Sequence, residues 1–356
     1  MKRIEIDKRD VYRAKHDIIT DEETLFYESY KKAAASLKEI IKASQSFGLD
    51  FDLGKNRMTN NIILFDGERG YGKTTAMQSF STFLEEPKEK VDSLFQFKAK
   101  FLCIDTIDPS CMNSKESIVR VVLTYLFSLV MPKLKQIKAG DRQDNLLKVG
   151  ILDHFQTCYS FIDYLNGSEK SKDFMPDDIE YISRLGNSNE LRKEIWELIK
   201  KIIELIGTEN AEDKEIRGIV NYKKMDIFIV LKIDDADLST SSIFKLCDEI
   251  RSYFSLPYIV IIMAGSLKYI RNNIVAEYIS KFENGGFNYV EMAARYVEKI
   301  FPQGRVIRLP RIDELLLNRS EDLRLEYHDK NKKNFHLCGW KIEQCNRLKI
   351  KILYTI

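Results

Sequence analysis

Residues 61–74 read NIILFDGERGYGKT, and this stretch indicates the class of fold to which the chain belongs. Its first half, Asn61–Asp66, has the length and apolar composition of a strand that is buried on both faces, as in a parallel sheet. Gly67–Thr74 follows at once and matches the phosphate-binding pattern G-x-x-x-x-G-K-[ST]. A helical pattern then begins at Lys73 and extends to about residue 83, so the motif lies between a strand and a helix, as the pattern requires.

The phosphate-binding pattern has a physical purpose. Its glycines let the backbone curl so that successive N–H groups point inward and form a concave anion site, to which the following helix adds its positive dipole end. We expect Lys73 to bridge the β- and γ-phosphates and the Thr74 hydroxyl to bind Mg²⁺. The residues expected to bind the nucleotide are Gly67, Glu68, Arg69, Gly70, Tyr71, Gly72, Lys73, Thr74 and Thr75.

Two alternatives accompany this motif. A random chain of this length would match the four fixed positions roughly once in a hundred tries, so chance is the first alternative. The strand before the motif and the helix after it make chance a weak explanation. The second alternative concerns Arg69 alone, which is expected either to contact phosphate or simply to cap the loop.

A second apolar run ends in two carboxylates. Phe228–Ile233 is followed by Asp234 and Asp235, which is a Walker B arrangement at the carboxyl end of a strand, where ligands bind in open α/β sheets. We expect Asp234 to hold Mg²⁺, usually through water, and Asp235 to orient or deprotonate the attacking water. Taken alone, the pattern is equally typical of a strand that ends in a solvated acidic turn. The phosphate loop favours the functional interpretation.

Ser266 is a third candidate for a catalytic role. It follows the apolar run Tyr258–Ala264 and Gly265, where NTPases with an extra strand carry a polar residue that senses the γ-phosphate. The alternative for Ser266 is an ordinary Gly-Ser turn.

An arginine could stabilise the charge on the transferring phosphoryl group, from the same chain or from a neighbouring one. Arg295 is the preferred candidate because it opens a helical segment, and a solvated arginine is the alternative for each of the five candidates, Arg271, Arg295, Arg305, Arg308 and Arg311.

Strands alternate with helices over most of the chain, which predicts an α/β fold: a parallel sheet that is flanked by helices on both faces. The other expected strands are Phe101–Asp105 and Arg305–Leu309, and helices are expected over about 21–46, 115–130 and 291–300. Pro132 is expected to end the second of these helices. The segment 133–225 is polar, charge-mixed and mostly helical in pattern, with Glu190–Ile206 as its clearest helix.

These patterns divide the chain into four parts. We expect residues 1–55 to form an N-terminal helical segment and residues 133–225 to form a helical insertion. A P-loop NTPase core is expected from 56–132 and 226–311 together. Residues 312–356 would be a short C-terminal tail or a truncated lid.

The composition narrows the class of protein. The chain has 356 residues, 44% hydrophobic and 31% charged, with a formal net charge of +2, so nucleic acid binding stays possible but is not indicated. No apolar run is long enough to cross a bilayer, and the N-terminus has no signal-peptide pattern. Six cysteines without a C-x-x-C pair indicate reduced thiols and a cytoplasmic location. The absence of an N-K-x-D guanine signature favours ATP over GTP.

Together, the motifs resemble the KAP-type P-loop NTPases, which are close to the STAND and AAA+-like ATPases. The similarity covers about residues 60–310, and the segments that carry it are Gly67–Thr74, Ile104–Ser110, Ile233–Asp237, Tyr296–Gln303 and Ile307–Pro310. The resemblance implies an extra strand between the phosphate-loop strand and the acidic strand. It also implies hydrolysis of Mg²⁺–ATP coupled to conformational change or assembly, a homo-oligomer with a protein partner, and a role in bacterial anti-phage defence.

Two departures from that family matter. Many members carry transmembrane helices in the insertion, whereas segment 133–225 is polar here, so a member without membrane association is indicated. Little chain follows Pro310, so the helical lid expected in such ATPases is missing or vestigial.

Two functions of different class therefore stay open. The first is an ATP-hydrolysing motor or switch that works as an oligomer, which Asp235 favours. The second is a non-hydrolysing module in which ATP binding shifts a conformation that a partner reads, which the short tail favours. A small-molecule kinase is a third and weaker interpretation, because the helical insertion and the sensor strand argue against it.

Overall fold

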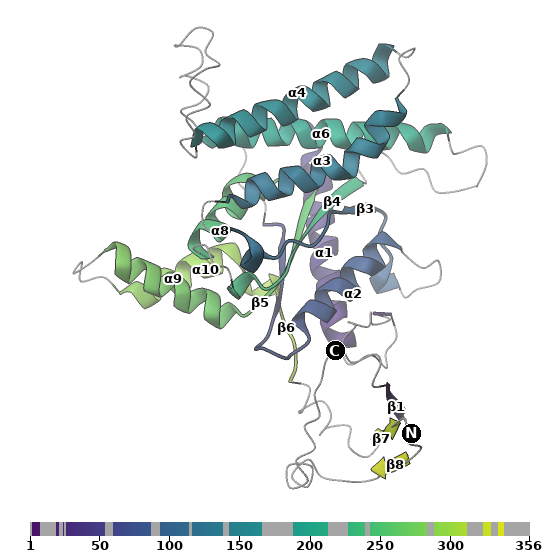
Figure 1. Cartoon of the computed structure of the whole chain (residues 1–356), viewed down its shortest axis with the longest axis vertical. Helices are drawn as coiled ribbons and strands as arrows, with labels where there is room; N and C mark the ends of the chain where they lie inside the picture. Colours follow the sequence, from purple (N-terminus) through teal and green to yellow (C-terminus); the bar gives the residue numbers. More distant parts are fainter. Residues whose placement is uncertain are drawn as a thin grey trace.

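The predicted strands form one sheet in the computed structural model of the protein (Figure 1). The strand order is β3-β4-β5-β2-β6, and all four pairings are parallel. The bounds are β2 Ile62–Asp66, β3 Lys100–Cys103, β4 Ile227–Ile233, β5 Ile259–Gly265 and β6 Val306–Arg308. The prediction of an α/β fold with a parallel sheet is therefore confirmed.

The structure describes residues 2–7, 19–20, 24, 26–53, 60–86, 93–113, 116–137, 142–165, 188–212, 227–238, 243–282, 288–311, 323–328 and 334–337. Within the predicted insertion, residues 138–141, 166–187 and 213–225 lie outside this set, as does most of the predicted tail 312–356. Among the described helices, none combines the length and the apolarity needed to cross a membrane.

The two central strands are the most deeply buried part of the sheet. Every residue of β5 is buried, and in β4 only Lys232 is partly exposed. Such strands are rich in isoleucine and valine because branched side chains pack well on a pleated surface that is covered on both faces. The Lys232 side chain extends out of the buried region, and its Nζ lies 3.7 Å from the carboxylate of Glu85. Strands β3 and β6 form the two edges of the sheet.

Helices cover both faces of the sheet (Figure 1). On one side lie α1 and α2, which both contact Phe95, through Tyr27 and Phe83 respectively. On the other side lie α8, α9 and α10. The bounds of the helices are α1 Tyr27–Phe47, α2 Lys73–Glu85, α3 Ile118–Gln136, α4 Arg142–Leu165, α6 Ser188–Glu212, α8 Ile243–Glu249, α9 Leu267–Lys281 and α10 Tyr289–Ile300.

Two long helices of the predicted insertion, α4 and α6, stack beside the sheet next to α3 (Figure 1). Helix α6 is anchored at the amino-terminal end of β5. Trp196 stacks on Tyr258 with ring centroids 6.4 Å apart, and the Arg192 guanidinium donates a 3.0 Å hydrogen bond to the Ser255 carbonyl oxygen. These contacts place α6 at the opposite end of the sheet from the phosphate-binding motif, which follows the carboxyl end of β2.

Two predicted helix boundaries are wrong. Helix α3 does not stop before Pro132 but continues through it to Gln136. A proline inside a helix costs about 3 kcal/mol, and burial of Val130 and Leu134 on either side of it offsets this cost. Helix α1 begins at Tyr27 rather than near residue 21, and no side chain caps it.

A second, small sheet joins segments from the two ends of the chain. Strand β1, Lys2–Asp7, pairs in parallel with β7, Leu323–His328, and β7 pairs antiparallel with β8, Asn334–Leu337. A helical segment and a tail are the elements predicted for these residues, so these three strands were not predicted. All three strands are short. Strands β1 and β7 lie far apart in the chain, and no hairpin signal lies between β7 and β8.

Candidate functional site

The loop between β2 and α2 is shaped by glycines in the left-handed region. Gly70 has φ of 87° and Gly72 has φ of 78°, which L-residues with a side chain rarely adopt. At Gly72 the space is also closed, because an added Cβ would lie 2.9 Å from Cζ of Phe26. The backbone can therefore make this curl only with glycine at these positions.

The start of α2 carries the polar groups of the motif. No side chain caps this helix, since its N-cap residue is Gly72, so the first-turn N–H groups remain for another acceptor. Lys73 is buried, and its Nζ folds back over the loop to the Glu68 carbonyl oxygen at 3.4 Å. The Thr75 side chain is 1% exposed, and its hydroxyl has no hydrogen-bond partner among the described residues. An orphaned hydroxyl and a buried ammonium at a helix N-terminus fit an anionic ligand such as phosphate.

A hydrogen bond joins this loop to the acidic strand. The Thr74 hydroxyl donates to Asp234 Oδ1 at 3.0 Å, across 160 residues of sequence. The same oxygen accepts from the Asp235 backbone N–H at 2.9 Å. Asp235 itself has φ of 44°, an uncommon conformation for a residue with a side chain. The two segments singled out in the sequence therefore meet at the carboxyl edge of the sheet.

The acidic pair is held in an environment that disfavours negative charge. Burial raises the pKa of Asp234, the neighbouring Asp235 raises it further, and the hydrogen bond from Thr74 acts in the opposite direction. Burial also raises the pKa of Asp235, followed by the charge of Asp237, while Lys73 lowers it. A divalent cation beside these carboxylates would stabilise their ionised forms.

The residues of this site suit a magnesium ion that keeps part of its water shell, rather than a metal ion enclosed entirely by protein ligands. Among the described residues there is no group of three or more His, Cys, Asp or Glu side chains that could hold a metal ion. Magnesium usually keeps several waters and is bound through one or two carboxylates together with substrate phosphates. Thr74 and Asp234, which already lie within hydrogen-bonding distance, are the groups that would hold it.

Ser266 lies at the same edge of the sheet. It follows β5, the strand between β2 and β4, and its side chain is buried without capping α9. The start of α9 is instead tied to the phosphate-loop strand, because the Leu267 N–H donates to the Asp66 carboxylate at 2.8 Å. Ser266 therefore follows the strand that lies between the phosphate-loop strand and the acidic strand, at the edge of the sheet where the loop and the acidic pair also lie.

Arg295, the preferred arginine, is not brought to this edge. It lies on α10, is 79% exposed, and pairs with Glu291 one turn away at 2.5 Å. Arg305 turns toward α1, where it contacts the Ser36 carbonyl oxygen and lies 3.2 Å from the Glu39 carboxylate.

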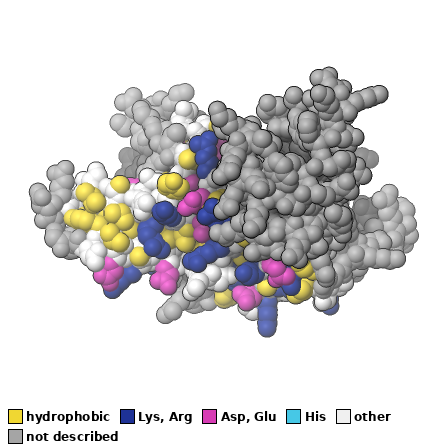
Figure 2. Space-filling model, turned by 90° about the horizontal axis from the view of Figure 1, so that it is seen from below, with side chains coloured by type: hydrophobic (Ala, Val, Ile, Leu, Met, Phe, Trp, Pro, Cys, Tyr) yellow, Lys and Arg dark blue, Asp and Glu magenta, His cyan; other side chains and the backbone are white. Residues whose placement is uncertain are grey.

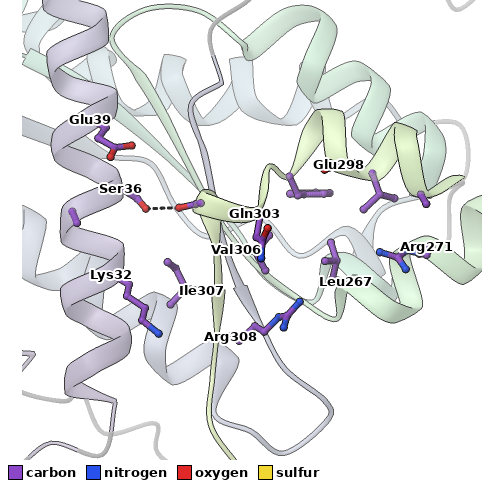
Figure 3. Close-up of a pocket in the computed structure, with 15 residues that line it drawn as sticks. Lys32, Ser36, Glu39, Leu267, Arg271, Glu298, Gln303, Val306, Ile307 and Arg308 are labelled. Atoms are coloured by element: carbon purple, nitrogen blue, oxygen red, sulfur yellow. Dashed lines mark hydrogen bonds between the residues drawn. The ribbon is translucent and has the colours of Figure 1, made fainter. Parts of the chain in front are cut away.

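Arg271 and Arg308 instead line a groove beside the phosphate-loop strand (Figure 3). The groove has a volume of about 650 Å³ and lies between α1, β6 and the α9–α10 pair. Lys32 lines it from α1, and Arg308 is the register partner of Asp66 in the sheet. Lys73, Thr74 and Asp234 are not among its lining residues, so this groove adjoins the phosphate loop rather than containing it.

Two acidic residues of this edge were not selected as site residues from the sequence. Asp237 follows the acidic pair, and its Oδ1 is buried without a hydrogen-bond partner among the described residues. Asp108 lies in the loop after β3. Each belongs to a quoted segment, Ile233–Asp237 or Ile104–Ser110, and the signal that could have found them is an acidic residue just beyond a buried strand.

No protein-family model and no curated protein sequence matches this chain. The chemistry of the site therefore rests on its own residues: a curled glycine loop, a buried lysine, an unpartnered hydroxyl and two carboxylates at one edge of a parallel sheet.

The conformation of Gly72 can be tested by substitution. Gly72→Ala introduces a Cβ at positive φ and against the Phe26 ring, so we expect it to lower the free energy of unfolding by about 1–3 kcal/mol. Gly304→Ala is the matched control, because an added Cβ there meets nothing within 4 Å. Urea denaturation of both variants measures the difference, and equal midpoints would contradict the described loop geometry.

Proposed function

We propose that this chain is a cytoplasmic P-loop NTPase of the KAP type, which binds ATP with Mg²⁺ and hydrolyses it. The observation that carries the proposal is the 3.0 Å hydrogen bond between Thr74 and Asp234, since these are the two protein groups expected to share the magnesium ion. The strand order supports it, because β5 lies between the phosphate-loop strand β2 and the acidic strand β4. The Thr75 hydroxyl, which has no hydrogen-bond partner in the part of the chain that the structure describes, supports a phosphate near the loop.

In this proposal each residue has one role. The N–H groups of the loop and the Lys73 ammonium bind the phosphates, and the Lys73 charge stabilises the negative charge that develops during transfer. Asp234 and Thr74 hold Mg²⁺, which supplies charge neutralisation at the phosphate oxygens. Asp235 orients the attacking water and accepts its proton, and Ser266 contacts the γ-phosphate from the neighbouring strand.

Lys73 provides the direct test of nucleotide binding. Lys73→Ala removes the buried ammonium, and we expect ATP–Mg²⁺ affinity to fall roughly 50-fold, which corresponds to a loss of about 2–3 kcal/mol. Lys268→Ala is the control, because Lys268 is also a cation near the loop, 4.0 Å from Glu68, but is 73% exposed. Isothermal titration calorimetry measures both. Unchanged affinity in Lys73→Ala would contradict the proposed site.

Asp235 separates hydrolysis from the alternative of a non-hydrolysing switch. Asp235→Asn keeps the shape of the side chain but removes the charge, so we expect phosphate release to fall about 100- to 10,000-fold while nucleotide affinity changes little. Both quantities are measured on the same preparation by phosphate release and calorimetry. Nucleotide binding by the unmodified chain without any turnover, alone or with a partner, would favour the switch instead.

We also propose that the chain assembles with further copies and a protein partner, as the resemblance to defence-associated ATPases implies. Exposed apolar side chains on the α9–α10 pair support a protein contact there, and Figure 2 shows hydrophobic surface on this side of the molecule. These side chains are Tyr269, Ile279, Phe282, Val290 and Met292. Arg295 is exposed on the same pair of helices, where a neighbouring copy could receive it.

Assembly is tested by mass measurement with and without ATP. We expect ATP to shift the purified chain to a defined oligomer, because nucleotide that binds one assembly state more tightly shifts the population toward it. Ile279→Asp, which places a charge among the exposed apolar side chains of α9 and α10, is expected to abolish this shift without loss of ATP binding. A monomer at all ATP concentrations would contradict self-assembly.

A further inference from the structure

Asp108 is fixed beside the acidic pair by the backbone of the preceding residue. The Ile107 N–H donates to the Lys232 carbonyl oxygen at 2.8 Å, and the Asp234 N–H donates to the Ile107 carbonyl oxygen at 2.9 Å. These two bonds extend the β3–β4 pairing beyond the end of β3. Asp108 is the next residue, so it lies at the carboxyl edge of the sheet, level with the site that Asp234 and Asp235 form.

The Asp108 carboxylate is held in one place by its own loop. It caps the short 3-10 helix Pro109–Cys111: Oδ1 accepts from the Ser110 N–H at 2.8 Å and from the Ser110 hydroxyl at 2.6 Å. Oδ2 accepts from the Cys111 thiol at 3.4 Å. Although partial burial acts against the charged form, these hydrogen bonds lower the pKa of Asp108, so its side chain stays ionised as well as fixed.

This fixed charge acts on the acidic pair. The 3-10 helix that Asp108 caps contacts Ala236–Leu238, the turn that follows Asp235. After burial and the nearer carboxylates, the charge of Asp108 is a further cause of the raised pKa of both Asp234 and Asp235. The three carboxylates at this edge repel one another, and a divalent cation bound beside Asp234 would offset that repulsion by attracting each of them.

Capping alone does not account for a charged residue here. Asparagine caps a helix about as well as aspartate, and it would not add to the charge beside Asp234. The negative charge of Asp108 therefore needs an explanation other than helix capping. Two other groups indicate independently where a ligand would bind. They are the buried Lys73 ammonium and the Thr75 hydroxyl, which has no hydrogen-bond partner among the described residues.

We propose that Asp108 is a positioning residue for the magnesium ion of the nucleotide site, and that its carboxylate attracts the ion and orients the ion's water shell beside Asp234. This inference rests on the proposed function, because it concerns the ion that accompanies the nucleotide. It assigns Asp108 no direct role in nucleotide binding. Magnesium retains several waters in such sites, and a carboxylate in the next shell orients them.

The test measures metal affinity rather than turnover. The full chain is saturated with a non-hydrolysable ATP analogue, and Mn²⁺, which is visible by electron paramagnetic resonance, is titrated in place of Mg²⁺. Asp108→Asn keeps the cap and removes the charge, so we expect Mn²⁺ affinity to fall about 5- to 10-fold, as for the loss of one charge several ångströms from a divalent ion. Affinity for the metal-free analogue is expected to stay within twofold.

Asp105→Asn is the matched control, because Asp105 is an exposed carboxylate three residues earlier in the same loop. It is expected to leave Mn²⁺ affinity within twofold of the unmodified chain. If Asp108→Asn also stays within twofold, or if both variants weaken Mn²⁺ binding equally, the inference is overturned while nucleotide binding stands. If the unmodified chain binds no Mn²⁺ with the analogue, both the inference and the proposed function are overturned.

Discussion

The contact between Thr74 and Asp234 is the interaction on which the site depends. It joins the first turn of α2 to the end of β4, although β5 separates β2 from β4 in the sheet. The contact exists because parallel strands end at a common edge, so the loop after β2 and the residue after β4 face the same space. Any change that shifted β5 by one register position would move Asp234 relative to the loop.

Negative charge exceeds positive charge at this edge of the sheet when the protein chain is considered alone. The partly buried carboxylates of Asp234 and Asp235 have raised pKa values, and Asp108 adds a charge that its own loop keeps ionised. An arrangement of this kind costs stability unless a cation compensates it. The lysine that faces the pair, Lys73, supplies one positive charge, and a magnesium ion with phosphates would supply the rest of the balance. This charge distribution is therefore consistent with the proposed binding of a metal–triphosphate complex.

The helices of the insertion attach at the other end of the sheet. Trp196 and Arg192 of α6 contact Tyr258 and Ser255, which precede β5, whereas Ser266 follows it. A single buried strand therefore connects the proposed phosphate contact with the anchoring point of α6. At the start of α3, the helix that leads into the insertion, the Glu249 carboxylate accepts from the Ser117 hydroxyl at 2.8 Å and from the Ile118 N–H at 3.0 Å, which ties α3 to α8 within the core.

The local elements follow from residues that are close together in the chain. The strands, the glycine loop and the helix at Lys73 could be predicted because apolar spacing and turn chemistry act within a few residues of one another. Which segments meet depends on long-range contacts. Examples are that β5 lies between β2 and β4, that Asp108 lies beside Asp234, that Arg271 and Arg308 rather than Arg295 line the groove beside the phosphate-loop strand, and that β1 pairs with β7. The tertiary structure also decided that α3 continues through Pro132, where packing outweighs the local cost. The physical reason is that propensity is a property of neighbouring residues, whereas strand order and burial depend on contacts between residues far apart in the chain.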